Sequence, residues 1–138
     1  MAINESSLNF MEEGKAAVQG LKTNFIRQES GVLTYPALLY FLQYEYLRYQ
    51  AYDWPLSLII FEMSKVSNSA IGGLDLINKQ ETAVALRRIS AIKRPLDLLG
   101  HFEAINYALL LPNTDIVTAN QIAKNVIKTL AAQSLTVA

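Results

Sequence analysis

The sequence predicts an α+β domain: a mainly antiparallel sheet with a central hairpin at about residues 96–111, covered by helices and preceded by an N-terminal helix. The predicted elements follow in the order helix, helix, strand, helix, hairpin, helix, which is typical of this class. A length of 138 residues supports one domain with its own core. A composition of 51% hydrophobic and 17% charged residues excludes a disordered chain.

The first predicted helix covers residues 5–28 and begins with a serine cap. Apolar side chains at heptad spacing give it a short coiled-coil-like stripe: Met11, Val18, Leu21 and Phe25. Two heptads interrupted by glycines leave two interpretations equally open, packing on its own domain and a dimer contact. We therefore divide the chain into an N-terminal signalling or packing helix, residues 1–30, and a globular domain, residues 31–138.

The second predicted helix has Thr34 as its cap and Pro36 in its first turn, and it ends near Asp53. Six of the seven tyrosines lie between Tyr35 and Tyr52. An aromatic run can stack on nucleic-acid bases, but no basic strip accompanies this one. Packing in the core or at an interface is therefore the favoured interpretation.

The rest of the chain combines short apolar runs with segments of helical periodicity. We predict a buried strand at residues 56–63, a polar break at 64–73 and a helix at 74–93. Two hairpin strands follow at residues 96–102 and 105–111, and a last helix at 115–133. Residues 135–137 are suited to start another strand. A sheet trimmed at that point would have an exposed edge, which favours pairing with another chain.

Composition excludes several classes of function. The formal net charge is zero and the isoelectric point is about 6.6, so nucleic acid is not expected as a partner. Cysteine is absent, which excludes disulfides, thiol catalysis and thiolate metal sites. The most apolar stretch, residues 56–61, is far shorter than the roughly 20 residues that a bilayer requires, and no signal peptide is visible. We expect a soluble, cytoplasmic protein without a membrane partner.

Two segments around the predicted hairpin resemble a known family. Residues 97–102, Asp-Leu-Leu-Gly-His-Phe, and residues 107–114, Tyr-Ala-Leu-Leu-Leu-Pro-Asn-Thr, look like the signature hairpin of GGDEF domains, the catalytic modules of diguanylate cyclases. Residues 55–64 resemble the family's first strand, and residues 33–34 resemble its entry. The resemblance covers about residues 31–135 and implies a nucleotidyl-cyclase-like fold. Because GGDEF domains continue with a further strand, helix and hairpin, it also implies a domain truncated at the C-terminus.

The signature turn departs from the family pattern at all five positions. The residues Glu103, Ala104, Ile105, Asn106 and Tyr107 stand where the family has Gly-Gly-Asp/Glu-Glu-Phe. Without the two glycines, the backbone cannot approach phosphates as closely. With Ile105 at the acidic position, a metal ligand is lost.

The other positions at which the family holds metal and guanine are also replaced. Glu62 stands for the first carboxylate of the first strand and Ser64 for the second, while Ala70 and Lys79 take the places of the guanine-reading Asn and of a later Asp. One carboxylate cannot hold the two magnesium ions on which phosphoryl transfer relies. The resemblance therefore implies a degenerate domain that is not an enzyme, without catalytic residues or a metal site.

One feature of the family is retained, an Arg-x-x-Asp motif five residues before the turn. Arg94 and Asp97 stand there, and in the family this motif is an allosteric site for cyclic di-GMP. A guanidinium can grip a guanine edge or a phosphate, and a carboxylate can accept from guanine N–H groups. The alternative interpretation is structural, since Arg94 suits a helix C-terminus and Asp97 can pair with it.

Together these features predict a catalytically inactive GGDEF-like module for regulation or interaction in bacterial signalling. One form of the hypothesis is a cyclic di-GMP receptor that uses Arg94 and Asp97, with no other cofactor. The alternative form is a purely structural protein-interaction or dimerisation domain without a nucleotide ligand. In both forms the expected partner is another protein or a second copy of the chain.

Overall fold

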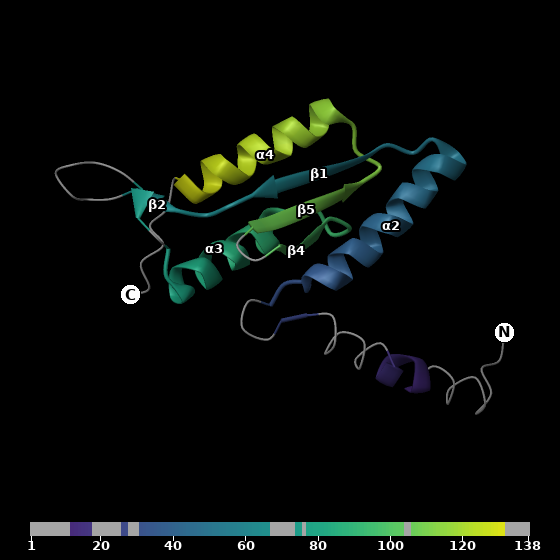
Figure 1. Cartoon of the computed structure of the whole chain (residues 1–138), viewed down its shortest axis with the longest axis horizontal. Helices are drawn as coiled ribbons and strands as arrows, with labels where there is room; N and C mark the ends of the chain where they lie inside the picture. Colours follow the sequence, from purple (N-terminus) through teal and green to yellow (C-terminus); the bar gives the residue numbers. More distant parts are fainter. Residues whose placement is uncertain are drawn as a thin grey trace.

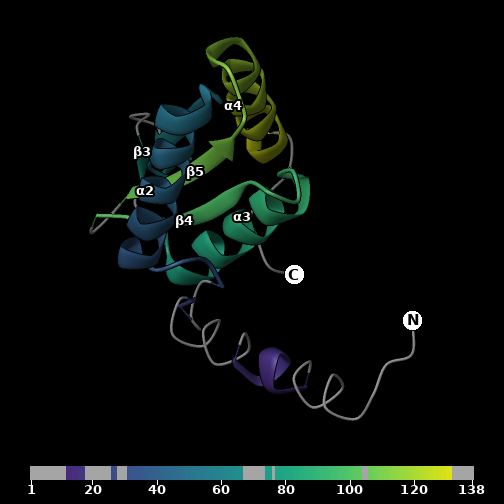
Figure 2. The same ribbon diagram turned by 90° about the vertical axis from the view of Figure 1, so that its right-hand side faces the viewer.

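Three antiparallel strands form the centre of the molecule in this computed structural model, which describes residues 12–17, 26–27, 31–66, 74–75, 77–103 and 106–131. The strands are β1 (Leu56–Phe61), β4 (Leu98–Phe102) and β5 (Asn106–Pro112), in the spatial order β1-β5-β4. Helix α2 (Tyr35–Tyr52) covers one face of this sheet, and α3 (Lys79–Ile92) and α4 (Ile116–Ala131) cover the other (Figures 1 and 2). The predicted α+β class with its central hairpin is confirmed.

The middle strand β5 has a continuous run of apolar residues. It pairs with a strand on each side: Leu109, for example, lies opposite Ile59 on β1 and Leu99 on β4. Residues 108–111 are all buried, because helices lie on both faces of this strand. A strand covered on both faces has no reason to alternate apolar and polar side chains.

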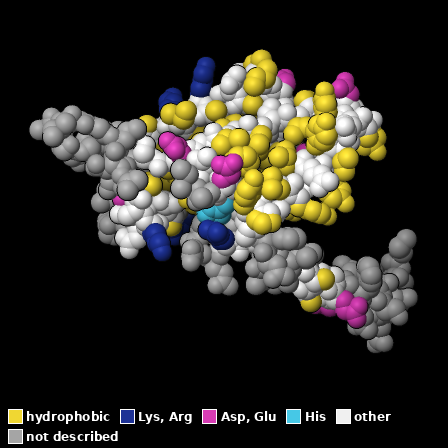
Figure 3. Space-filling view, in the orientation of Figure 1, with side chains coloured by type: hydrophobic (Ala, Val, Ile, Leu, Met, Phe, Trp, Pro, Cys, Tyr) yellow, Lys and Arg dark blue, Asp and Glu magenta, His cyan; other side chains and the backbone are white. Residues whose placement is uncertain are grey.

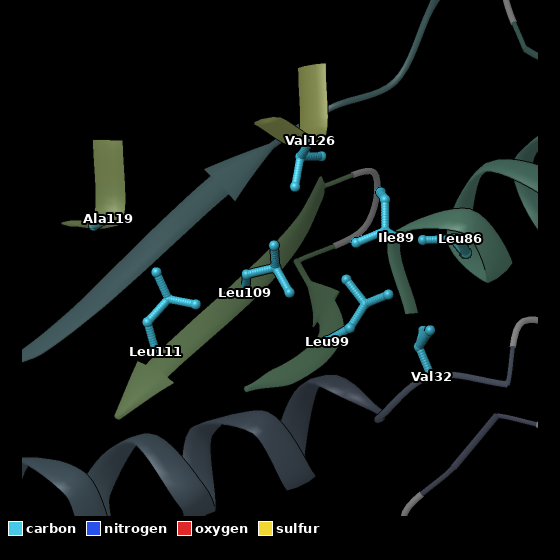
Figure 4. Close-up of a cluster of buried hydrophobic side chains, with 8 residues drawn as sticks. All are labelled: Val32, Leu86, Ile89, Leu99, Leu109, Leu111, Ala119 and Val126. Atoms are coloured by element: carbon cyan, nitrogen blue, oxygen red, sulfur yellow. The ribbon is translucent and has the colours of Figure 1, made fainter. Parts of the chain in front are cut away.

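The core lies in two layers, one on each face of the sheet. Figure 4 shows the layer beneath α3 and α4, which consists of Val32, Leu86, Ile89, Leu99, Leu109, Leu111, Ala119 and Val126. The layer beneath α2 is centred on Leu38, Ala108 and Leu110. Side chains of successive β5 residues enter opposite layers, as the period of a strand requires. Burying these side chains is the main force that holds the helices to the sheet.

Helix α2 has the limits that its local signals predict. The Thr34 hydroxyl accepts a hydrogen bond from the backbone N–H of Ala37 at 3.3 Å, and Pro36 lies in the first turn. The helix ends at Asp53, whose backbone adopts a left-handed conformation with φ 58°. Gly100 on β4 allows the helix to lie close to the sheet, since a Cβ there would be 3.1 Å from Leu38 Cβ.

The predictions for strands and for the last helix are confirmed to within about two residues. The predicted strand 56–63 is β1, and the predicted hairpin strands are β4 and β5. The predicted helix 115–133 is α4, capped by Asp115, whose Oδ1 accepts from the backbone N–H of Thr118 at 2.8 Å. The predicted strand at 135–137 lies outside the described residues.

The start of the third predicted helix is wrong. Residues 74–75 form a short strand, β3 (Leu74–Asp75), which pairs with β2 (Lys65–Val66) inside the predicted polar break. Helix α3 begins after Asn78, because Asn78 and Glu81 form a capping box: the Asn78 side chain accepts from Glu81 N at 2.8 Å, and Glu81 accepts from Asn78 N at 3.3 Å.

The first predicted helix is also too long at its C-terminal end. Residues 12–17 are helical, but Ile26 forms an isolated antiparallel bridge with Leu33 and so is not helical. Leu33 also continues the sheet beside β4, since its N–H donates to Leu99 O at 3.1 Å and its carbonyl accepts from His101 N at 2.9 Å. In the part of the chain that the structure describes, no helix has the length and apolar character needed to cross a bilayer.

Candidate functional site

The Arg-x-x-Asp motif lies where α3 ends and β4 begins, and its two side chains bind each other. Arg94 Nη2 donates to Asp97 Oδ1 and Arg94 Nε donates to Asp97 Oδ2, both at 2.9 Å. The backbone N–H of Arg94 donates to the same Oδ2 at 3.1 Å. The Asp97 side chain is 1% exposed, whereas that of Arg94 is 43% exposed. The hydrogen bond to the Asp97 carboxylate raises the pKa of Arg94 above its usual value.

Thr114 joins this pair to two strands. Its hydroxyl accepts a hydrogen bond from Arg94 Nη2 and donates one to the Pro112 carbonyl at 2.8 Å. Its backbone carbonyl accepts from the Ser57 hydroxyl at 2.8 Å, and its N–H donates to the Pro55 carbonyl at 3.0 Å. This Arg94–Asp97–Thr114 network therefore ties the start of β4, the end of β5 and the start of β1 together. The sequence places Thr114 at the end of the predicted hairpin, but no local pattern joins it to Arg94 and Asp97.

The geometry supports a structural role for Asp97. Both carboxylate oxygens accept hydrogen bonds from Arg94, and the group is buried. A buried carboxylate that loses its partner is strongly destabilising. The structural alternative considered for the motif therefore describes the observed contacts of Asp97, while a ligand-binding role for Arg94 and Asp97 stays a prediction.

A hollow of about 640 Å³ opens beside this network. We call it the arginine hollow; it is lined by Glu45, Arg48, Trp54, Arg94, Pro95, Leu96, Asp97, Pro112 and Asn113. The Arg48 side chain is 52% exposed and its Nη1 lies 3.3 Å from Oε1 of Glu45, which is 15% exposed. Trp54 is 50% exposed, and its ring centroid lies 5.2 Å from that of Tyr52. Sequence reasoning did not find Arg48 and Trp54, because no local pattern joins them to Arg94.

The turn between β4 and β5, which the sequence predicts to be a degenerate signature turn, is described in part. Glu103 is exposed and has a left-handed φ of 57°, a conformation that suits glycine better than glutamate. Asn106 begins β5 and is paired with Phe102. Ala104 and Ile105 lie outside the described residues. Glu103, which stands at one of the two positions where GGDEF domains have glycine, therefore has a backbone conformation that favours glycine over glutamate.

Tyr107, the last position of the signature, contributes to packing. Its ring centroid lies 5.9 Å from that of Phe61 and 5.1 Å from that of His101. Burial raises the pKa of the Tyr107 hydroxyl above its usual value. The side chain thus belongs to the edge of the core beneath α3 and α4.

The positions that would hold magnesium do not fit that ion. Glu62 is exposed directly after β1, and Ser64 follows two residues later without a charge. Lys79 places a positive charge at the start of α3, and Ala70 lies outside the described residues. Among the residues that the structure describes, no group of three or more His, Asp or Glu side chains is arranged to bind a metal. One carboxylate among these described positions is a poor donor set for a pair of hard divalent cations.

The outer face of α2 is the other unusual surface. Six large apolar side chains of α2 are between 40% and 52% exposed: Leu39, Tyr40, Tyr44, Tyr46, Leu47 and Tyr49. The helix buries Ala37 and Leu38 instead. The suggestion that the tyrosines pack in the core is therefore wrong for these side chains, because the sheet contacts the opposite side of the helix. The interface alternative is not affected.

The hairpin, the helices on both faces and the position of the Arg-x-x-Asp motif define the class of fold: that of GGDEF-type diguanylate cyclases. No protein-family model and no curated protein matches the chain. A solved structure with this fold is the diguanylate cyclase SiaD from Pseudomonas aeruginosa, in complex with its activator SiaC. It has 18% identity and a TM-score of 0.72, over 96% of this chain and 50% of that one.

A second structure with the same fold is a DGC protein from Thermotoga maritima. It has 21% identity and a TM-score of 0.54, over 75% of this chain and 74% of that one. At these identities the likeness establishes the fold, so the predicted GGDEF-type architecture is confirmed. The chain spans half the length of SiaD.

Proposed function

We propose that this chain is a noncatalytic regulatory module with the diguanylate cyclase fold, which acts in signalling by associating with another protein chain, in the first instance a second copy of itself. The outer face of α2 carries this proposal. Tyr40, Tyr44 and Leu47 follow one another at helical spacing and stay exposed. Figure 3 shows hydrophobic side chains gathered over the side of the molecule on which α2 lies. Contiguous apolar patches of this kind mark interaction sites, and aromatic side chains are enriched in interfaces.

The charge of this face suits a self-complementary contact. Glu45 and Arg48 are the charged residues of α2, and they pair with each other within the helix. The outer face is therefore neutral, so two copies would meet without repulsion between like charges. A two-fold interface requires such self-complementarity, because the same patch faces itself. SiaD, which has the same fold, is bound to its protein activator SiaC in the solved structure.

Light scattering after gel filtration tests the association. We expect a mass of twice 15.4 kDa for the wild type at micromolar concentration and 15.4 kDa for the double variant Tyr44→Ser, Leu47→Ser. The matched control is the double variant Val117→Ser, Ile127→Ser, which removes exposed apolar side chains from α4 and should stay dimeric. A wild-type protein that is monomeric at all concentrations would contradict self-association.

The noncatalytic part of the proposal is supported by the donor set at the family's metal positions. Only Glu62 offers a carboxylate among those positions that the structure describes. The test is incubation of the full chain with GTP and Mg²⁺ and chromatography of the products. We expect no cyclic di-GMP above the level of a protein-free sample, and product formation that disappears in Glu62→Ala would overturn this part.

A second candidate function is that of a cyclic di-GMP receptor at Arg94 and Asp97. The observation that favours it is the arginine hollow, in which the retained motif stands beside a second arginine, Arg48. Guanidinium groups bind phosphates through paired hydrogen bonds. Calorimetric titration of the full chain with cyclic di-GMP tests it: saturable binding is expected, and no heat at millimolar ligand would contradict it.

A further inference from the structure

We propose that the open edge of β1 binds a second copy of the chain, so that the two β1 strands pair antiparallel about a two-fold axis and the two sheets become one. This contact is separate from the outer face of α2 and does not depend on it. The sheet has the order β1-β5-β4, so β1 lies at one edge. The other edge is occupied by Leu33, whose N–H and carbonyl bond to β4. Among the described residues, no strand pairs with the outer side of β1.

Strand β1 is apolar along its length but is not covered. Five of its six residues are apolar, yet none of the six is fully buried, and Ile60 is 49% exposed. On β5, by contrast, residues 108–111 are all buried. Helix α4 lies beside β1 in Figure 1, and a groove of about 690 Å³ between them is lined by both. An edge strand without a charged residue or a proline to block it is a template for a further strand.

The backbone groups that face this edge follow from the pairing of the sheet. The Leu99 carbonyl on β4 accepts from Leu33, so the backbone groups of Leu99 point away from β5. Leu109, opposite Leu99, therefore directs its own groups to β1, where Ile59 is its partner. Hydrogen-bonded pairs alternate along an antiparallel ladder, so the neighbours of Ile59 direct their groups outward. Three residues of β1 present their N–H and C=O at the outer edge in this way: Leu56, Leu58 and Ile60.

One register joins all three of these residues to a second copy. When two identical strands pair antiparallel, the residue on the two-fold axis lies opposite its own copy. With Leu58 on the axis, Leu56 lies opposite Ile60 of the second copy, and each pair exchanges two backbone hydrogen bonds. Paired side chains lie on the same side of the joined sheet, because the paired positions differ by an even number. A register shifted by two residues would lose one of the three pairs.

The charges of α4 suit the same arrangement. Between residues 115 and 131 the charged side chains are Asp115 at the start of the helix and Lys124 and Lys128 toward its end. Helix α4 runs in the same direction as β1 (Figure 1), so an axis that makes the strands antiparallel makes the two α4 helices antiparallel as well. Asp115 of one copy then lies toward the lysines of the other. This complementarity of charge favours a second copy as the occupant of the edge.

Two isoleucines of α4 have the exposure that such a contact would remove. Ile116 and Ile127 are 69% and 68% exposed and lie near opposite ends of the helix. They are about three turns apart and so lie on the same side of α4, the side on which Ile116 and Ala123 line the groove. In an antiparallel pair of helices, Ile116 lies toward Ile127 of the second copy. Exposed apolar side chains gathered beside an open edge are the kind of surface that an interface buries.

Single cysteines can locate the axis, because the sequence has no cysteine. The test uses the full chain with Tyr44→Ser and Leu47→Ser, in which association through α2 is removed. Leu58→Cys should give a disulfide-linked dimer under mild oxidation, since opposite residues of a hydrogen-bonded pair have Cα atoms about 5.5 Å apart. Ile60→Cys is the matched control. It is the more exposed position, yet the register separates its two copies by about 14 Å along the strands, so at least tenfold less dimer is expected.

A proline at the edge gives a second test that needs no cross-link. Ile60→Pro removes an outward N–H and leaves the bonds between β1 and β5 in place. In the same Tyr44→Ser, Leu47→Ser chain, sedimentation at tens to hundreds of micromolar should show a dimer, and Ile60→Pro should raise its dissociation constant at least tenfold. Ile60→Thr is the control, because it also loses apolar area but keeps the N–H, and it should have the smaller effect. Circular dichroism confirms that each variant is folded.

Four outcomes would overturn the inference. Equal cross-linking of Leu58→Cys and Ile60→Cys would indicate random collision, and equal effects of Ile60→Pro and Ile60→Thr would place the contact elsewhere. Slow hydrogen exchange of the Leu58 and Ile60 amides in dilute monomer would mean that the chain covers its own edge, with residues 132–138 as the first candidates. A Tyr44→Ser, Leu47→Ser chain that stays monomeric at every concentration would refute the edge contact, while a wild-type dimer would leave association through α2 standing.

Discussion

The two ends of the central sheet differ in what their polar residues do. At the end where β1 begins and β5 ends, Arg94, Asp97 and Thr114 form a network of which two members are buried. At the opposite end, where β1 ends and the signature turn lies, Glu62 and Glu103 are exposed. We infer from this comparison that the fold depends on the polar residues at the first end, because buried groups are costly to leave without hydrogen bonds. Where the same kind of residue is solvated, the fold tolerates its replacement.

The largest expected effect comes from breaking the buried network. Arg94→Ala would leave the Asp97 carboxylate buried without a cation, and we expect the free energy of unfolding to fall by about 2–3 kcal/mol, below the range for fully buried pairs because Arg94 is partly exposed. Urea denaturation measures it, with Arg87→Ala as the control. A loss of under about 0.5 kcal/mol, which is usual for surface substitutions, would remove the distinction between the two ends.

A change of opposite sign is expected at the signature turn. Glu103 has φ 57°, so Glu103→Gly replaces a residue in an unfavourable left-handed conformation by one that adopts it freely. We expect stabilisation of about 0.5–1 kcal/mol, the left-handed strain being offset in part by the larger entropy of glycine in the unfolded chain. Thermal unfolding of the two proteins side by side measures it, and destabilisation would show that the Glu103 side chain makes contacts worth more than the strain.

A smaller effect should appear as a dependence on pH at the start of α4. Hydrogen bonds from Thr118 lower the pKa of Asp115 below its usual value. A carboxyl group with a lowered folded-state pKa stabilises the protein above its unfolded-state pKa, and this contribution is lost as the pH falls through the folded-state pKa. Urea midpoints between pH 6 and pH 2 should therefore fall less steeply in Asp115→Asn, which keeps a cap but does not titrate. Parallel curves would contradict the assignment.

The smallest effect is expected for Glu62→Ala. Because this carboxylate is exposed and no ion pair with it is found in the described part of the chain, stability should change by less than about 0.5 kcal/mol. The same denaturation experiment as for Arg94→Ala gives the comparison directly. A loss as large as that of Arg94→Ala would mean that the turn end is under the same structural constraint as the network end.

Local signals account for the parts of the fold that could be predicted. Thr34 and Pro36 mark the start of α2, and the apolar runs at β1 and β5 mark buried strands. Prediction failed where local signals compete: residues 74–75 precede a helical pattern without a break, and the Asn78 cap decides where α3 begins. The end of the first helix was misplaced because Ile26 pairs with Leu33, a contact that helical periodicity does not encode.

The candidate site was predictable only in part. Arg94 and Asp97 stand three residues apart, within the range in which sequence spacing implies contact, and the structural pairing was among the alternatives. Thr114, Arg48 and Trp54 were not found, because they come from other turns and helices. The outward direction of Tyr40 and Tyr44 was not found either, since aromatic content alone does not say which side of a helix meets the sheet.

The amino-acid sequence by itself determined the class of fold and the order of its main elements, and it predicts the loss of the metal ligands of diguanylate cyclases. These properties depend on side-chain type and on spacings of a few residues, along which backbone hydrogen bonds and apolar periodicity act. Only the tertiary structure decided that Asp97 is buried, that Ser57 binds Thr114 across 57 residues of sequence, and that Arg48 and Trp54 share a hollow with Arg94. These contacts arise when the helices pack on the two faces of the sheet, and the burial that results sets the energy of each polar group.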